Sequence, residues 1–325
     1  MSILHLCNSF FEFELAGSLP STLEEAMVSD AIFLQLQFLP LSYANPGEKT
    51  LVSELPSNFP TEPFALLETP PKDGVLQTWG ASLLIKEWAD KWSLEYEIPP
   101  WDVVKRVNSK VYSFEKSPLP GARLLTSFEK LPPHFVLKSC FGTAGRGHIK
   151  VDHPKAKDFC KREWNQNRVV VAEPWVETIC DFSTQWEISK DEITLIGTAF
   201  LETSPTGKHV GNVVGDEAKE AKFAKEILAH KEFVLPTLKE MKEMGYFGPV
   251  GFDAFIYRYQ NEVLLQPIVE INARKTMGWL TLKIQKTKAP ENIVSVSYLP
   301  SKEGGILPLT LGSRTFSRQL FVTIQ

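Results

Sequence analysis

Three oxygen-bearing side chains near the C-terminus, Asp253, Glu270 and Asn272, have the types and the spacing to hold a divalent cation. Two runs of β-forming residues carry them, separated by the polar tip at residues 259–262. Strand side chains alternate with period 2, so a hairpin places all three on one face. Mg²⁺ binds to carboxylates together with substrate phosphates. This hairpin is therefore predicted to hold magnesium against phosphate.

The register of that hairpin depends on its turn. A two-residue turn at Gln260 and Asn261 predicts that Asp253 lies opposite Ile268 and that Glu270 is its diagonal neighbour. Pro267 cannot donate to a strand ladder and indicates an edge or a bulge, and a bulge would shift the register by one residue. An ordinary hairpin with solvated acids is the alternative. The apolar surroundings of Glu270 disfavour it, because a lone acid there needs a partner.

Residues 135–151 read as a strand, a glycine-rich turn and a second strand, with Lys138 at the end of the first strand. Gly142, Gly145 and Gly147 would let backbone N–H groups face a bound phosphate, while Lys138 supplies a charge. The spacing is neither a Walker loop nor a Rossmann fingerprint. Taken alone, the segment could equally be a simple glycine-rich turn.

Residues 169–183 form an apolar strand that runs into a hinge and an acidic turn. Within the hinge Glu173, Pro174, Trp175 and Val176, the carbonyl of Pro174 and the N–H of Val176 could pair with an adenine edge. Asp181 could accept hydrogen bonds from ribose hydroxyls. A strand with an exposed turn explains this segment equally well by itself.

The composition describes an ordinary globular chain. It has 325 residues, 43% of them hydrophobic, and a net charge of -4, which suits two or three subdomains and gives no general attraction to nucleic acid or anionic membrane. No run approaches the length of a membrane span, and a cytoplasmic location is the expectation. The four cysteines lack paired spacing and are expected to be reduced thiols.

The first 105 residues give a weak periodic signal, with strands expected at 3–6 and 31–37. A helix is expected after Ser82 as N-cap, with Trp88 and Trp92 in the core. A short helix is expected at 102–110. Strands are then expected at the following ranges: 135–139, 169–173, 182–188, 193–201, 250–258 and 263–271.

A long helical tract at 216–244 separates the last two strand pairs, with a break expected at Pro236 and a stop at Gly245. This order of strands, helix and hairpin predicts an α+β fold. The segment 204–212, between a strand and that tract, has the Gly and Pro content of a mobile loop that could close on substrate. Neither His148 nor His209 has a visible acid partner, so no general base is identified.

Read in order, several of these short motifs resemble the ATP-grasp superfamily over about residues 100 to 290. They are Asn108-Ser-Lys110, Lys138 with its glycine turn, the Glu173–Val176 hinge, Asp181-Phe-Ser, Asp253, and Glu270-Ile-Asn272-Ala-Arg274. The resemblance implies that Lys110 and Lys138 contact ATP phosphates, that the hinge lines the adenine pocket and that Asp181 holds ribose. Asp253, Glu270 and Asn272 would carry two Mg²⁺ ions, for which Mn²⁺ could substitute.

The resemblance also implies an architecture and a reaction. An N-terminal α/β (pre-ATP-grasp) domain would span residues 1–105. An ATP-grasp domain would span 106–325, with a nucleotide lobe at 106–180 and a metal-binding, catalytic lobe at 181–325. A carboxylate would attack the γ-phosphate of ATP to give an acyl phosphate and ADP, and an amine would then convert it to an amide. Arg274 is the catalytic candidate, because its planar fork could hold the acyl phosphate or the oxyanion of the tetrahedral intermediate. A surface arginine paired with a glutamate is the alternative.

Other activities are compatible with the same residues. A small-molecule kinase would stop after phosphoryl transfer, and a regulatory protein would bind nucleotide without turnover. The expected partners are a small carboxylate and a nucleophile such as an amino acid or peptide, with no nucleic acid and no membrane, and the chain could form a homodimer. The sequence does not identify the carboxylate or the nucleophile.

Overall fold

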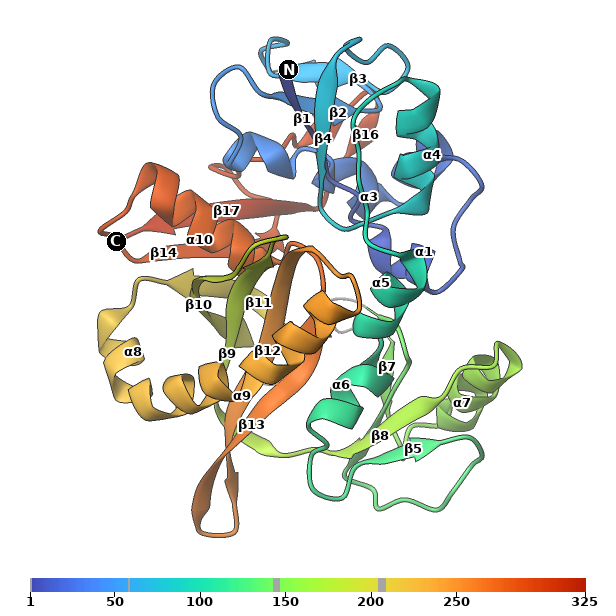
Figure 1. Ribbon diagram of the computed structural model, residues 1–325, viewed down its shortest axis with the longest axis vertical. Coiled ribbons are helices and arrows are strands. Elements are labelled where there is room, and N and C mark those ends of the chain that lie inside the picture. Colours follow the sequence, from blue (N-terminus) through green and yellow to red (C-terminus); the bar gives the residue numbers. More distant parts are fainter. Residues whose placement is uncertain (1, 58, 143–146, 204–208) are drawn as a thin grey trace. The chain divides into compact units, whose positions relative to one another are not determined.

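A computed structural model describes residues 2–57, 59–142, 147–203 and 209–325 (Figure 1). The chain forms two compact units. Unit 1 comprises residues 1–101, 210–215 and 274–325, and unit 2 comprises residues 102–209 and 216–273. The first break lies close to the predicted boundary at residue 105, whereas residues 274–325 group with unit 1. The division into functional domains at 1–105 and 106–325 stays a prediction.

Unit 1 contains an α/β layer, as expected for the N-terminal segment. Its sheet is parallel, in the order β3-β2-β1-β4. The strands are β1 (Ser2–Leu6), β2 (Lys49–Val52), β3 (Phe64–Leu66) and β4 (Gly74–Thr78). The helices of this layer are α1 (Phe11–Leu15), α2 (Leu23–Val28), α3 (Ala31–Leu36) and α4 (Leu83–Lys91), with the 3₁₀ helix η1 (Leu39–Ser42). Helices and sheet share one hydrophobic core.

The expected strand at 31–37 is wrong, because this segment is α3. The carboxylate of Asp30 accepts a hydrogen bond from the N–H of Ile32 at 2.9 Å and so begins the helix. The expectation for Ser82 is confirmed, since its hydroxyl accepts from the N–H of Ile85 at 3.2 Å and caps α4. At residues 31–36, the capping residue Asp30 therefore overrides the β-forming residues that follow it.

The C-terminal part of unit 1 adds antiparallel strands and one helix. Strands β11 (His209–Val214), β14 (Val294–Pro300) and β17 (Arg318–Ile324) pair in that order. Helix α10 (Met277–Lys288) packs on β14, and β15 (Thr310–Leu311) and β16 (Arg314–Thr315) form a small ribbon. The sequence beyond Gly278 carries no recognisable substrate signature.

Unit 2 is built on antiparallel strands in the order β13-β12-β9-β10. They are β9 (Glu177–Ile188), β10 (Ile193–Thr203), β12 (Gly248–Tyr259) and β13 (Glu262–Asn272). Helices α8 (Glu217–Lys222) and α9 (Ala224–Glu243) follow β11 in the chain, and α9 packs across β9, β12 and β13 (Figure 1). The helical tract breaks at Phe223 and not at Pro236, which lies inside α9, and it stops at Gly245 as expected.

The two faces of the β9–β12–β13 sheet differ. Phe182, Trp186, Phe252 and Ala254 belong to buried clusters with side chains of α9. The alternate positions, which point to the other face, carry acids, amides and hydroxyls. One face is therefore committed to the core, and the other is free to carry chemistry.

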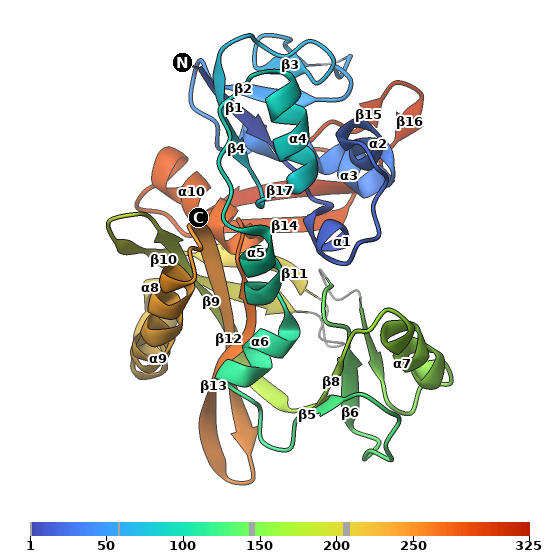
Figure 2. The same ribbon diagram turned by 45° about the vertical axis from the view of Figure 1, so that its right-hand side comes forward.

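A second, smaller sheet in unit 2 has the order β5-β8-β6-β7 and carries α7 (Ala156–Asn165) (Figure 2). Its strands are β5 (Arg123–Leu125), β6 (Phe135–Lys138), β7 (His148–Lys150) and β8 (Val170–Pro174). The expected single helix at 102–110 is instead two helices, α5 (Trp101–Val107) and α6 (Lys110–Lys116), separated by Asn108 and Ser109. All four cysteines are free and buried. None of the described helices is long and apolar enough to cross a membrane.

Candidate functional site

The β12–β13 hairpin closes with the predicted turn, because Tyr259 pairs with Glu262. Its register then differs from the prediction. Phe255 pairs with Gln266, yet Asp253 pairs with Glu270, so three residues of β13 lie opposite one residue of β12. The expectation that Asp253 faces Ile268 is wrong, and so is a shift of one. A shift of two residues keeps every side chain on its original face.

This register brings the three predicted metal ligands together. Asp253 and Glu270 are direct cross-strand partners, a position that separates Cβ atoms by about 4.5–5.5 Å. Asn272 Nδ2 donates to Asp253 Oδ2 at 3.0 Å. Lys110 Nζ, from the first turn of α6, forms an ion pair with Glu270 Oε1, and both side chains are mostly buried. Four predicted site residues thus form one group.

The neighbouring strand β9 extends this polar face. Gln185 pairs with Gly251, Ser183 with Asp253, and Asp181 with Phe255, so all three β9 side chains share the face of Asp253. Ser183 and Gln185 are buried, and Gln185 Nε2 donates to Ser183 Oγ at 2.9 Å. Sequence reasoning missed both residues. Alternation counted forward from the predicted ribose residue Asp181 would have identified them.

Residues 108–110 fix the start of α6 beside this group. Ser109 caps the helix by accepting from Val111 N–H at 3.1 Å, and the N–H of Lys110 donates to the carbonyl of Cys140 at 3.0 Å. Asn108 Oδ1 accepts from the N–H of Ala273 at 2.8 Å, directly after Asn272. The segment therefore anchors Lys110 and the end of β13 together.

The strand that precedes the predicted glycine-rich turn carries a second charged group. Lys138 Nζ forms an ion pair with Glu173 of β8, and both side chains are mostly buried. Gly147 has φ +86°, and an added Cβ would lie 2.5 Å from Ser139 Oγ, so this position needs glycine. The carbonyl of Gly142 accepts a long contact of 3.5 Å from Lys110 Nζ. Gly145 lies outside the described residues.

His148 connects the two charged groups. It is the direct cross-strand partner of Lys138 in the β6–β7 pair. Partial burial lowers the pKa of His148, and the positive charges of Lys138 and Lys110 lower it further, while Glu270 acts in the opposite direction. Lys138, Lys110 and Glu270 therefore all act electrostatically on this one imidazole.

The predicted nucleoside segment is a hinge between β8 and β9. Glu173 and Pro174 end β8, Trp175 is exposed, and its N–H donates to the carbonyl of His134 at 2.7 Å. Burial raises the pKa of Asp181, although Thr178 Oγ1 donates to its carboxylate at 3.1 Å. The assignment of the hinge to adenine and of Asp181 to ribose stays a prediction.

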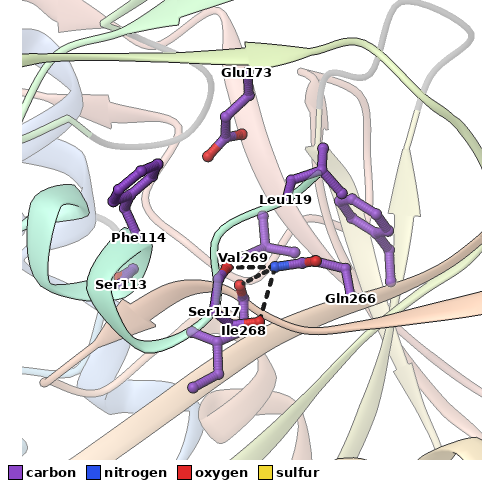
Figure 3. A pocket seen from close by; sticks show the side chains of 9 residues that line it. Ser113, Phe114, Ser117, Leu119, Glu173, Gln266, Ile268 and Val269 are labelled. Carbon is purple, nitrogen blue, oxygen red and sulfur yellow. Dashed lines mark hydrogen bonds between the residues drawn. The ribbon is translucent and has the colours of Figure 1, made fainter. Parts of the chain in front are cut away.

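A narrow cavity adjoins Glu173 (Figure 3). Its walls come from α6, the segment after it, and the β12–β13 hairpin, and include Phe114, Leu119, Phe255 and Val269. The cavity volume of about 10 Å³ admits roughly one water molecule, so a purine ring would require these side chains to move. The sequence did not single out these apolar residues, although Val269 immediately precedes Glu270.

Arg274 belongs to unit 1 and is held there by two contacts. Its Nε donates to Glu12 Oε1 of α1 at 2.6 Å, and its Nη1 donates to the carbonyl of Lys275 at 3.2 Å. Both charged side chains are mostly buried. The N–H of Lys275 donates to the carbonyl of Trp79 at 2.8 Å, which attaches this segment to the carboxyl end of β4. Glu12 gave no signal in the sequence.

The donor set of the first group fits a hard cation. Carboxylate and amide oxygens from Asp253, Glu270 and Asn272 are the ligand types that Mg²⁺ prefers, and phosphate and water supply the remainder. Within residues 2–57, 59–142, 147–203 and 209–325, no group of three His, Cys, Asp or Glu side chains could hold a metal. The two carboxylates and the amide leave coordination positions that phosphate and water could fill.

No protein-family model and no curated protein matches the sequence. Solved structures match over nearly the whole chain. An ATP-grasp superfamily protein from Archaeoglobus fulgidus is 16% identical, with full coverage of both chains and a TM-score of 0.50. An N5-carboxyaminoimidazole synthetase from Staphylococcus aureus, solved with ADP, is 12% identical over 99% of this chain and 93% of its own (TM-score 0.51). An L-amino acid ligase from Bacillus licheniformis is 11% identical with the same coverage (TM-score 0.52).

Proposed function

Because this chain has the ATP-grasp fold, we propose that it is an ATP-dependent ligase that activates a carboxylate as an acyl phosphate and joins it to an amine. The products would be an amide, ADP and phosphate. Two of the similar structures are named as a synthetase bound to ADP and as an amino acid ligase, which supports this reaction class. The cytoplasm remains the expected compartment.

The observation that carries the proposal is the pairing of Asp253 with Glu270 on the polar face, with Asn272 and Lys110 in contact. A sheet that only needed stability would gain little from two half-buried acids placed opposite each other beside a lysine, because such charges lose hydration. Phosphoryl transfer does need them. It requires cations on the developing charge and a fixed alignment of the reacting oxygens.

Each residue has a defined part in this reaction. Asp253, Glu270 and Asn272 would hold Mg²⁺, which when bound neutralises phosphate charge. Lys110 and Lys138 would contact the phosphates, and both now pair with glutamates of the same site. On substrate binding, each lysine would therefore leave its glutamate and pair with a phosphate instead. Arg274 would stabilise the acyl phosphate or the oxyanion of the tetrahedral intermediate through its guanidinium fork.

The substrates are proposed only by class, as a small carboxylate and a nucleophile such as an amino acid or peptide. The test is an ADP-release assay with Mg²⁺-ATP over a panel of acids crossed with amines, with mass spectrometry of the products. ADP that requires both an acid and an amine supports the ligase. ADP formed with one substrate and a stable phosphorylated product would identify a kinase. Nucleotide binding with no ADP across the panel would argue for a regulatory protein.

A further inference from the structure

Two registers of the β12–β13 hairpin would keep the same alternation of side chains between its two faces. Regular continuation from the pair Phe255 and Gln266 would place Asp253 opposite Ile268 and Glu270 opposite Gly251. The observed register instead places Glu270 opposite Asp253. The two registers differ by two residues, or roughly 7 Å along the strand, and leave every side chain on the same face. Polar and apolar patterning therefore cannot choose between them.

The difference lies in three residues, Pro267, Ile268 and Val269, which lie opposite Ala254 alone and which we term the bulge. A bulge removes backbone groups from the ladder, and a buried carbonyl without a partner is unfavourable. The side chain of Gln266, 5% exposed, satisfies one of them. Its Nε2 donates to the carbonyl of Ile268 at 2.8 Å and to the carbonyl of Ser117 at 2.6 Å (Figure 3).

A second buried side chain satisfies the adjacent carbonyl. His230 of α9 is 0% exposed, and its Nδ1 lies 2.8 Å from the carbonyl of Pro267. Its Nε2 lies 2.7 Å from Thr184 Oγ1, which in turn accepts from Trp186 Nε1 at 2.8 Å. A carbonyl can only accept, so the proton is on Nδ1 and Nε2 accepts from Thr184. This chain links β9 to the bulge across the core face of the sheet.

We propose that Gln266 and His230 are positioning residues that select the bulged register and so place Glu270 opposite Asp253. This inference rests on the proposed function, because the alignment matters through the cation that the two acids share. His230 lies on the core side of the sheet, whereas Gln266, the cross-strand partner of Phe255, lies on the face of Asp253. Both act on the backbone between the two ligands, at carbonyls that exist in this position only when the bulge is formed.

The test measures Mn²⁺ binding to the full-length protein with saturating ADP, by electron paramagnetic resonance, with thermal unfolding as the check of folding. Gln266→Met keeps the volume and removes the donor. His230→Leu removes the Nδ1 donor, whereas His230→Asn places an amide N–H near the same position. Thr184→Val is the matched control, since it is equally buried and contacts His230 but no atom of the bulge.

We expect Gln266→Met and His230→Leu to weaken Mn²⁺ binding about 10–100-fold, the range seen when partners of metal ligands are lost. His230→Asn should recover part of the affinity, and Thr184→Val should retain it even if it unfolds at lower temperature. Folded Gln266→Met and His230→Leu proteins with unaltered Mn²⁺ affinity would overturn this inference and leave the proposed function unaffected. Absence of Mn²⁺ binding by the unaltered protein with ADP would overturn the proposed function as well.

A deletion provides a second test that does not depend on those substitutions folding. Removal of Pro267 and Ile268 places Val269 opposite Ala254, so that the regular register itself aligns Glu270 with Asp253. In this shortened hairpin, Mn²⁺ should bind, and Gln266→Met should no longer weaken its binding. An equal loss caused by Gln266→Met with and without the deletion would show that this residue acts otherwise than through register.

Discussion

The two hairpins that carry the candidate site hold their charged residues in different ways. In β12–β13, Asp253 and Glu270 are aligned by a bulge whose carbonyls bond to buried side chains. In β6–β7 and the adjoining β8, Lys138 and Glu173 hold each other, and His148 is exposed beside them. The first arrangement fixes a distance between ligands, and the second leaves a charge pair that can exchange partners.

This difference suits the two proposed roles, which are cation binding by the β12–β13 hairpin and phosphate binding by Lys138. Ligands of a cation must keep their spacing before the ion arrives, so it is useful that the core determines it. A lysine that meets phosphate must instead change its partner on binding, and a bound phosphate supplies a new anionic partner for Lys138 in place of Glu173. Substitutions in the first hairpin should therefore affect turnover, and substitutions in the second should affect nucleotide affinity.

The largest effect is expected from Glu270→Gln. The loss of one charged ligand should lower kcat by about 100-fold or more, because a bound metal contributes several kcal/mol to charge stabilisation. The measurement is ADP release at saturating Mg²⁺-ATP with the best substrate pair. Glu262→Gln is the matched control, since it removes an exposed acid from the tip of the same hairpin. Normal ADP release by a folded Glu270→Gln protein would be incompatible with the assigned metal site.

A smaller effect is expected from Lys138→Ala. A hydrogen bond to a charged group contributes about 1.5–3 kcal/mol, so ATP affinity should fall roughly 10–100-fold while kcat changes less. Calorimetric titration with ATP measures this. Lys150→Ala, an exposed lysine of β7 in the same hairpin, is the control.

The Lys138 variant also leaves Glu173 without its partner, which could act through stability alone. The double variant Lys138→Ala with Glu173→Gln separates the two effects, because it removes both charges. ATP affinity that returns to the unaltered value in the double variant would mean that Lys138 serves only to neutralise Glu173.

Two features of the β12–β13 hairpin could be predicted from the sequence, namely its side-chain alternation and its turn, because both depend on neighbouring residues. The Gln260–Asn261 turn, the shared face of Asp253, Glu270 and Asn272, and the stop at Gly245 all follow from nearby residues. The register did not follow, because its determinant, His230, lies on a helix packed against the opposite face. Pro267 indicated a bulge, but its size depends on which distant donors satisfy the freed carbonyls.

The ion-pair partners of the charged residues could not be predicted from the sequence either. Lys110 meets Glu270 across 160 positions, and Glu12 meets Arg274 across 262. Glu12 lies in a short helix of unit 1 with no motif around it, so only the folded chain reveals the pair. In contrast, Ser183 and Gln185 could have been found, since they follow from Asp181 by strand alternation.

An effect on turnover, outside both hairpins, is expected from Glu12→Gln. The neutral amide still accepts a hydrogen bond from Arg274 Nε but orients the guanidinium less firmly, so kcat should fall by about tenfold with little change in KM for ATP. Glu14→Gln is the control, because Glu14 lies in the same helix and accepts from the N–H groups of Leu83 and Leu84. Equal loss of kcat in both variants would indicate a general defect of α1.

The smallest effect is expected from mild acid. Burial lowers the pKa of His230 to about 4, from 6.5 in an unfolded chain. The folded protein therefore binds this proton less readily, so the stability that neutral His230 contributes is complete above pH 6.5 and is lost as the pH falls toward 4. Between pH 7 and pH 5 the free energy of unfolding should decrease by roughly 2 kcal/mol through this group.

Urea titrations at the two pH values, with the unaltered protein and His230→Leu, isolate the contribution of His230. His5 is also buried with a lowered pKa, but it is present in both proteins and its effect cancels in the difference. Hydrogen exchange at pH 5 should show greater loss of protection in β13 than in β6 or β7, because protonation places a charge on the buried imidazole that contacts the bulge. Earlier loss of protection in the β6–β7 hairpin would mean that the geometry of the β12–β13 hairpin does not depend on His230. The contrast between the two regions would then fail.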